Sequence, residues 1–174
     1  WLVPLWGNSP NQRFAAADIE VIGGLLPPNL FPDAVLSDHP DRLRAVWIDS
    51  SNPANTASNT AQVEKALCAL DLVVVVDVAM TETARLAHYV LPASSQYEKT
   101  EFTLFNFEFP KNYFHVRAGV LAPLEGTLPE PEIYTRLSRA LGLLPGDNAL
   151  APLRDAAFRS RTAFAAELRT FMGV

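Results

Sequence analysis

The chain contains very little cysteine, which limits the sites it can build. A single cysteine, Cys68, stands among its 174 residues. Because a disulfide needs two cysteines and multi-cysteine metal sites need more, neither can form within this chain. Cys68 directly follows Leu67 in a segment with helical spacing, and we expect it to be a packing residue.

Long apolar runs and a basic surface are also missing. The longest apolar run, Leu72–Val76, is far shorter than the ~20 residues that a membrane span needs. The net charge is −5 and the basic residues are scattered, whereas nucleic-acid-binding proteins carry a basic patch or stripe. We therefore expect no membrane span and no nucleic-acid partner. The chain shows no signal peptide, and we expect a cytoplasmic protein.

Several common catalytic and nucleotide-binding motifs do not occur. The sequence contains no GxGxxG, GxxxxGK, HExxH or GxSxG motif. These absences argue against an ordinary NAD enzyme, a nucleoside triphosphatase, a zinc protease and a serine hydrolase. His39, His88 and His115 lie far apart in the sequence, and a lone histidine is more often structural. We therefore predict no catalytic and no metal-binding residue.

Residues 43–77 show the pattern of a strand, a helix and a second strand. The first strand is predicted over Leu43–Asp49. Asn59 with Gln62 resembles a capping box, in which two side chains satisfy free N–H groups where a helix begins. The run Leu72–Asp77 is apolar and mostly β-branched, as in strands buried on both faces of a parallel sheet. Between them, apolar residues follow at helical spacing: Val63, Ala66, Leu67 and Leu70.

The next residues continue this alternation. Thr81 is expected to cap a short helix from Glu82 to about His88, and Tyr89–Leu91 to form a third strand that ends at Pro92. This order is typical of a right-handed, mostly parallel α/β sheet. We predict an α/β fold, with a mostly parallel sheet flanked by helices in a Rossmann-like three-layer arrangement.

The flanking segments are expected to differ from this core. Phe14–Gly24 is predicted to form a short helix, and prolines are expected to keep residues 27–33 in loops. Three phenylalanines alternate with polar residues over 105–109, and together with Tyr113–Arg117 they predict an antiparallel hairpin.

Helices are predicted for the C-terminal part of the chain. One covers Pro129–Leu141, with Gly142 just past its end, and the last lies around Phe164–Phe171. We assign residues 1–145 to an α/β domain and residues 146–174 to a C-terminal helical segment.

Polar residues follow two of the predicted strands, at Asp49–Pro53 and Asp77–Thr81. In open α/β sheets, ligands bind outside the carboxyl ends of the strands. The same residue types also end strands and form turns. Position alone therefore leaves both a ligand-facing edge and simple turns open.

Two motifs give the sequence a specific resemblance. One is Asn52–Thr56 (NPANT), and the other is Asp77–Pro92 (DVAMTETARLAHYVLP), followed by Tyr97–Lys99 (YEK). Together they resemble the molybdopterin oxidoreductase family, which includes formate dehydrogenases, nitrate reductases and dimethyl sulfoxide reductase. That family has an Asn-Pro turn after one strand, a D-x-x-x-T-E-T-A-x-x-A-D-x-V-L-P run after the next, and then a Glu-Lys pair. The resemblance covers about residues 20–142.

The resemblance implies a cofactor and a set of residues that bind it. The cofactor is a molybdenum or tungsten centre held by two pterin guanine dinucleotides, the bis-molybdopterin guanine dinucleotide. An aspartate suits the N1–H and exocyclic amine of guanine, and a lysine suits a pyrophosphate or pterin oxygen. Gly126 and Glu130–Ile133 also resemble a later G-E-x-x-x-D-x-E-I stretch of the family. By their positions in or beside these motifs, the implied cofactor-binding residues are Ser51, Asn52, Asp77, Thr81, Lys99 and Glu130.

Each of these positions also has a structural interpretation. Asp77 could simply end a strand, Lys99 could be a solvated charge, and Glu130 could offset a helix dipole. The pattern also departs from the family at three places. His88 replaces the usual aspartate, the glycine after the Glu-Lys pair is missing, and Thr127 stands where an acidic residue is expected.

The sequence also lacks three parts of the family: a cysteine cluster for an iron–sulfur centre, the segment bearing the metal's protein ligand, and a C-terminal β-barrel. We interpret the chain as an internal fragment, inactive alone, of a bacterial-type molybdopterin-dependent oxidoreductase, in which it binds one guanine dinucleotide arm. Its expected partners are the remainder of its parent chain, which would hold any iron–sulfur cluster, and a redox partner protein or electron carrier. Exposed apolar surface would also favour self-association.

Two other hypotheses stay open. One is a cofactor-free structural or electron-transfer scaffold related to the large subunit of respiratory complex I. The other is an unrelated α/β nucleotide-binding module.

Overall fold

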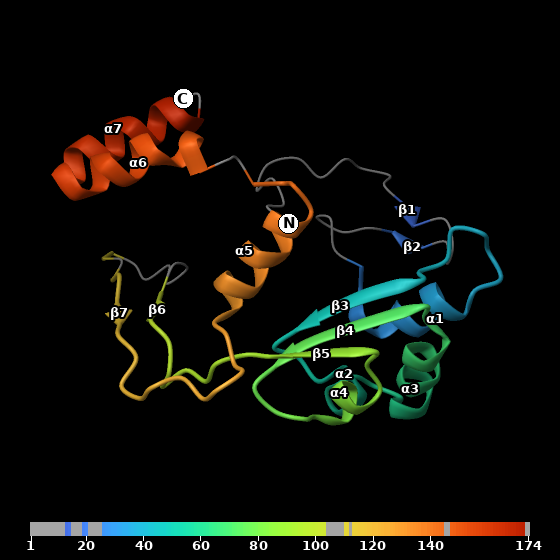
Figure 1. The fold of residues 1–174 in the computed structure, drawn as a ribbon. Helices are drawn as coiled ribbons and strands as arrows, with labels where there is room; N and C mark the ends of the chain where they lie inside the picture. Colours follow the sequence, from blue (N-terminus) through green and yellow to red (C-terminus); the bar gives the residue numbers. More distant parts are fainter. Residues whose placement is uncertain are drawn as a thin grey trace. The chain divides into compact units, whose positions relative to one another are not determined.

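The computed structural model describes residues 13–14, 19–20, 26–103, 110–111, 113–144 and 147–172 (Figure 1). The chain divides into two compact units, residues 1–130 and 131–174. The predicted domain boundary after residue 145 stays a prediction.

A three-stranded parallel sheet forms the centre of the first unit. Its strands are β3 (Ala45–Asp49), β4 (Leu72–Asp77) and β5 (Tyr89–Pro92), with β4 in the middle. Asp49 lies opposite Val76, and Asp77 lies opposite Pro92. The predicted mostly parallel sheet is therefore confirmed, and the carboxyl ends of all three strands lie at one edge of it.

Helices cover one face of this sheet. Between β3 and β4 lie α2 (Pro53–Thr56) and α3 (Thr60–Ala69), and between β4 and β5 lies α4 (Glu82–Arg85). Successive right-handed crossovers between neighbouring strands return on the same side, and Figure 1 shows α1 (Phe31–Leu36) on that side as well. Buried apolar side chains fill the layer between sheet and helices: Val35, Ile48, Ala54, Val63, Ala66, Leu67, Leu70, Val73, Val75 and Ala84. Each large member contributes roughly 1.5–3 kcal/mol by leaving water.

The two predicted helix starts in this unit are confirmed. Asn59 precedes α3 with a left-handed backbone (φ 61°), and its Oδ1 accepts a hydrogen bond of 3.4 Å from the N–H of Gln62. Thr81 precedes α4, and its Oγ1 accepts the N–H of Ala84 at 3.2 Å. The α4 helix ends at Arg85, three residues before the predicted end.

Two predictions for the N-terminal segments are wrong. Residues Arg13–Phe14 (β1) and Ile19–Glu20 (β2) pair as antiparallel strands where a helix was predicted from Phe14 onward. A helix this short is marginal without packing, so strand pairing can replace it. The predicted loop over 27–33 contains a 3-10 turn, η2 (Pro28–Leu30), and the start of α1. Proline is well suited to the first turn of a helix, where its missing N–H is not needed.

A short antiparallel pair follows the parallel sheet. It consists of β6 (Glu101–Phe102) and β7 (Val116–Arg117). An antiparallel pair that includes residues of the predicted second strand is confirmed, but its first strand is Glu101–Phe102. The predicted first strand, residues 105–109, lies outside the described residues. The chain then returns beside β5, where the N–H of Leu128 donates to the Pro92 carbonyl oxygen at 3.1 Å.

The second unit is helical. The helix α5 (Glu130–Ala140) runs into it from the last residue of the first unit, and α6 (Asp147–Arg159) and α7 (Arg161–Met172) pack against each other. As predicted, Gly142 follows α5, with a φ of 68° that glycine adopts without strain. The sequence predicted only the last of these two packed helices, because Pro152 interrupts the pattern of α6. None of the described helices is long and apolar enough to cross a membrane.

Candidate functional site

The chain turns sharply after β3, at the carboxyl edge of the sheet. Ser50 still belongs to the ladder, because its N–H donates to the Val76 carbonyl oxygen at 3.0 Å. Its φ of 51° lies in the left-handed region, which costs a residue other than glycine about 1–3 kcal/mol and is often found at functional sites. Ser51 comes next; it is exposed, and its side chain makes no hydrogen bond to the described residues. This turn therefore presents Ser51 to solvent at the predicted ligand edge.

Asn52 ties the loop after β3 to the start of α4. Its Oδ1 accepts two hydrogen bonds from Thr83, from Oγ1 at 2.7 Å and from the N–H at 3.2 Å. Its Nδ2 donates to Glu82 Oε2 at 2.7 Å. Thr83 is fully buried, and its Oγ1 also accepts the N–H of Ala54 at 3.0 Å. Two loops that are 30 residues apart in sequence are thereby fixed to each other.

Glu82 brings a negative charge to this network. The hydrogen bond from Asn52 is the largest factor that holds the pKa of the exposed Glu82 carboxyl below its ordinary value of 4.5. A backbone hydrogen bond lowers this pKa further, desolvation raises it, and the nearby Arg85 lowers it by a smaller amount. Glu82 is therefore a carboxylate at neutral pH, and Asn52 must serve it as a donor.

Asp77 ends the central strand at the same edge. The side chain is half-buried, and its Oδ1 accepts the N–H of Val78 at 2.7 Å and that of Ala79 at 3.3 Å. None of the described residues donates to the other oxygen, Oδ2. The loop therefore orients the carboxylate while one of its oxygens stays available to a ligand.

Thr81 has a structural role in the structure. Its Oγ1 is the cap of α4, and its N–H donates to the Ala79 carbonyl oxygen at 3.0 Å. Hydrogen bonds within the loop from Asp77 to Thr81 therefore fix its conformation. The loop continues directly into α4, whose Thr83 is hydrogen bonded to Asn52.

Lys99 and Glu130, both predicted to contact the cofactor, bind each other. Lys99 Nζ lies 2.6 Å and 2.7 Å from the two carboxylate oxygens of Glu130, and 3.7 Å from Glu101 Oε1. The side chains of Lys99 and Glu130 are only 11% and 19% exposed. Within the described part of the chain, no hydrogen bond or ion pair joins this pair to Asn52 or Asp77. The predicted residues therefore form two separate groups.

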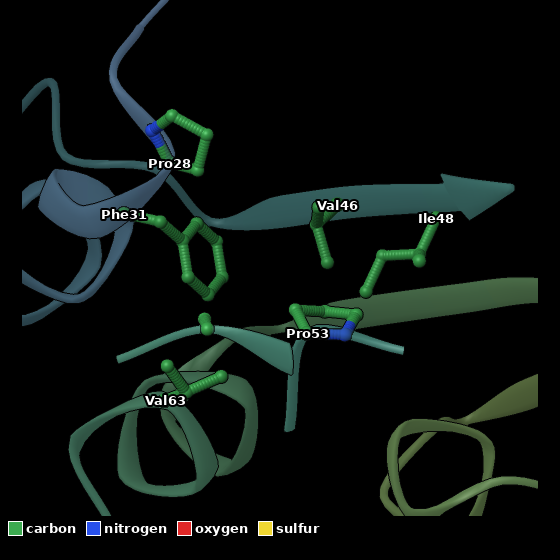
Figure 2. Close-up of a pocket in the computed structure, with 7 residues that line it drawn as sticks. Pro28, Phe31, Val46, Ile48, Pro53 and Val63 are labelled. Atoms are coloured by element: carbon green, nitrogen blue, oxygen red, sulfur yellow. The ribbon is translucent and has the colours of Figure 1, made fainter. Parts of the chain in front are cut away.

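The carboxyl edge is distinct from an apolar pocket on the helix-covered side (Figure 2). This pocket has a cavity volume of about 150 Å³, and Figure 2 shows Phe31, Val46 and Val63 directed into it from α1, β3 and α3. Its lining is apolar throughout, so it offers no polar group to a charged cofactor. The lining residues are Pro28, Phe31, Val46, Ile48, Pro53, Ala57 and Val63.

Comparison with known families assigns most of the first unit to a known family. Residues 11–120, more than half of the chain, match the sequence model of the family described as molybdopterin oxidoreductase. The chain belongs to the molybdopterin oxidoreductase family. The family assignment made from the sequence is therefore confirmed. This family consists of oxidoreductases that use a molybdenum or tungsten pterin cofactor.

Individual relatives of the molybdopterin oxidoreductase family agree with this assignment. The chain is 33% identical to the F420-dependent formate dehydrogenase subunit alpha of Methanocaldococcus jannaschii, over 75% of this chain and 18% of that protein. It is 27% identical to the thiosulfate reductase molybdopterin-containing subunit PhsA of Salmonella typhimurium, over 78% of this chain and 17% of that protein. Among solved structures, acetylene hydratase from Pelobacter acetylenicus is similar, with a TM-score of 0.59 and 28% identity over 67% of this chain and 16% of that one. The chain thus spans only about one sixth of the length of these proteins.

The structure explains the departure from the family pattern at His88. His88 lies just before β5, away from the carboxyl edge, and its Nδ1 accepts the N–H of Val73 at 3.0 Å. Its own N–H donates to the Val73 carbonyl oxygen at 2.9 Å. An aspartate, which the molybdopterin oxidoreductase pattern has here, could accept the same N–H through its carboxylate. His88 is therefore a structural acceptor at the start of β4, away from the ligand edge.

A glycine that is distant in sequence lies close to the Glu-Lys pair. A Cβ on Gly119 would lie 3.0 Å from the carbonyl carbon of Glu98 and 3.2 Å from the nitrogen of Lys99. A side chain at this position would therefore push the two backbone segments apart by a few tenths of an ångström. In this member of the family, Gly119 therefore allows a close approach of two backbone segments at the Glu-Lys pair.

Glu98 fixes the same loop from the other side. Its Oε2 accepts the N–H of Ser95 at 2.7 Å, and its Oε1 accepts the N–H of Leu124 at 2.8 Å. The hydrogen bonds from Ser95, and then that from Leu124, hold the pKa of the Glu98 carboxyl below its ordinary value of 4.5. Sequence reasoning gave a role to Lys99 of the Glu-Lys pair and missed Glu98. The Ser95 hydrogen bond is local, at the S-x-x-E spacing of a capping box, and could have been predicted, whereas the Leu124 hydrogen bond forms only when the two loops fold against each other.

Thr127, at the third departure, also has a structural partner. Its Oγ1 donates to the Leu124 carbonyl oxygen at 2.8 Å and lies 3.1 Å from the Oγ of Ser94, which is fully buried. The hydroxyl joins the returning segment to the residues after β5. Within the described residues, no three His, Cys, Asp or Glu side chains are grouped as a metal site requires.

Proposed function

We propose that the carboxyl edge of the β3–β4–β5 sheet binds one guanine dinucleotide arm of a molybdenum or tungsten bis-pterin cofactor. The observation that carries this proposal is the carboxylate of Asp77, which its own loop orients while Oδ2 stays available. Such an oxygen suits the donors of guanine, and charge-assisted bonds of this kind contribute roughly 1.5–3 kcal/mol each. Ser51 and Thr81 flank the same edge and complete the proposed contact area.

Lys99 and Glu130 form the second proposed contact. A phosphate or pterin oxygen near Lys99 would compete with Glu130 for its ammonium group, because the two residues are already paired at 2.6 Å. The bound metal centre would supply electron transfer between a small substrate and an acceptor, while the protein binds and orients the cofactor. This chain alone would be inactive, since the metal's protein ligand and any iron–sulfur cluster would belong to the rest of the protein.

We further propose that the rest of a longer protein covers the sheet face that α1–α4 leave open. Leu72 and Tyr89 are 39% and 64% exposed, and the matched relatives are about six times longer than this chain. Burying such side chains is favourable, and if they stay uncovered the isolated chain would self-associate. A redox partner protein or electron carrier and a cytoplasmic location remain further proposals.

The experiment is to measure molybdenum, tungsten and acid-released guanine nucleotide in the full-length protein, made in a cell that supplies the cofactor. About two guanine nucleotides per metal are expected. Asp77→Ala should lower this load about tenfold, and Asp77→Asn should do the same while keeping Oδ1 for the two loop N–H groups. Asp71→Ala, at the exposed opposite end of β4, is the matched control and should keep the full load. A full load in both Asp77 variants would contradict the assigned role.

A cofactor-free scaffold is the second candidate. It is favoured by the finding that Asn52, Lys99 and Glu130 all hydrogen bond within the protein. The same measurement separates the two functions. A well-folded full-length protein without metal and without guanine nucleotide would support the scaffold.

A further inference from the structure

We infer that Asn52 is a positioning residue, which aligns the loop after β3 with the loop after β4, and that it acts on the ligand through Glu82 and Thr83. This inference rests on the proposed function, because it concerns how the carboxyl edge is built to receive the guanine dinucleotide arm. The family resemblance implies a direct contact between Asn52 and the cofactor, and the inference therefore assigns the residue a different role.

The hydrogen bonds of Asn52 are largely used within the protein. An asparagine amide can accept two hydrogen bonds and donate two. Both acceptor positions of Oδ1 are occupied by donors of Thr83, and one N–H of Nδ2 is donated to Glu82. A ligand would have to displace these bonds to use the carbonyl oxygen. The side chain is therefore placed to organise protein groups.

The partners of Asn52 explain what it organises. The hydroxyl of the buried Thr83 donates to Asn52 and accepts from the N–H of Ala54, so neither side of this contact can shift without breaking a buried hydrogen bond. Thr83 and Glu82 directly follow Thr81, which closes the loop that begins at Asp77. Displacing α4 would therefore displace this loop.

The polarity of the Asn52–Glu82 bond offers a specific test. Asn52→Asp keeps the size of the side chain and an acceptor for Thr83, but it brings a second carboxylate to the position 2.7 Å from Glu82 Oε2. Two like charges at that distance repel each other. Adding Glu82→Gln restores one donor and one acceptor, with the direction of the hydrogen bond reversed. The double variant should therefore rebuild the contact between the loops.

The experiment uses the full-length protein produced with its cofactor supply, and it measures guanine nucleotide per folded molecule after gel filtration. The folded fraction is determined by near-ultraviolet circular dichroism. We expect the load of Asn52→Asp to fall about tenfold and that of Asn52→Asp/Glu82→Gln to return to within about twofold of the natural protein. Glu82→Gln alone keeps an acceptor for Asn52 Nδ2 and should lower the load less than Asn52→Asp does. Thr83→Val, which removes the hydroxyl, should lower the load more than Thr83→Ser, which retains it.

The controls separate positioning from other roles. Asn55→Asp adds the same charge to the same helix at an exposed side chain, and it should keep the load. A merely stabilising role would reduce the yield of folded protein and leave the load of each folded molecule unchanged, which would overturn the inference. An empty double variant combined with a loaded Glu82→Gln would also overturn it, because Asn52 would then touch the ligand. No guanine nucleotide in the natural protein would instead refute the proposed function itself.

Discussion

The ion pair between Lys99 and Glu130 allows a quantitative test of how the loop after β5 is held. Two unit charges 2.6 Å apart attract each other by about 6 kcal/mol at an effective dielectric constant of ~20, before desolvation is subtracted. Exposed ion pairs yield only about 0.2–1 kcal/mol, whereas removing one partner of a buried pair costs about 3–5 kcal/mol. Because these side chains are 11% and 19% exposed, we expect a coupling free energy of about 2 kcal/mol between them.

A double-mutant cycle measures this coupling. Lys99→Met, Glu130→Gln and the double variant would be compared with the natural full-length protein by native-state hydrogen exchange. The amides of Ser95 and Leu124 report the free energy of opening this loop, since both donate to Glu98. Each single variant should lower that free energy by about 2–4 kcal/mol, and the double variant by much less than the sum.

The chain provides a matched control pair two residues further on. Glu132 and Arg136 form an exposed ion pair of 2.8 Å within α5, with side chains 46% and 61% exposed. The same cycle on this pair, followed at the amides of α5, should give only about 0.3–0.5 kcal/mol. Equal coupling energies for the two pairs would refute the argument that burial makes the Lys99–Glu130 pair strong.

Two further predictions concern hydrogen bonds that the sequence did not reveal. The pKa of the Glu98 carboxyl is lowered in the folded protein. The stability that this carboxylate contributes is therefore complete above pH 4.5, its ordinary pKa, and is lost as the pH falls through the lower pKa of the folded protein. Hydrogen exchange of the Ser95 and Leu124 amides should accelerate over that acid range, and Glu98→Gln should remove this pH-dependent step. His88→Ala leaves the N–H of the buried Val73 without its acceptor and should lower the free energy of local unfolding by about 1–2 kcal/mol. His88→Asp retains an acceptor and should lower this free energy clearly less. Equal losses for the two variants in hydrogen-exchange measurements of β4 would show that the imidazole matters for another reason.

The sequence was most informative where structure depends on neighbouring residues. The run Leu72–Asp77 predicted β4 because a continuous β-branched segment suits a strand buried on both faces. Asn59 and Thr81 predicted where two helices begin, because a cap acts within three residues of itself. These features are local, and tertiary contacts reinforced them.

The site could be predicted only in part, because residue type does not determine hydrogen-bond partners. Lys99 and Glu130 were both predicted from the family pattern, yet nothing in the sequence indicated that they would pair with each other. Thr83 stands in the matched motif, but its residue type did not indicate that its buried hydroxyl joins two loops. Gly119 gave no signal, since its close approach to Glu98 arises only when the two segments fold together.

The order of the strands also bears on how the protein assembles. Each strand of the parallel sheet pairs with its neighbour along the chain, Ala45 with Leu72 and Val74 with Tyr89. These separations of 27 and 15 residues are short for a parallel sheet, so the entropy cost of closing its loops is smaller than for strands paired across the whole chain. Because the ribosome releases residues 45–92 as one uninterrupted stretch, this sheet with its helical layer is suited to form during translation. Asn52, Thr83 and Asp77 would then be in place before Lys99 and Glu130 emerge.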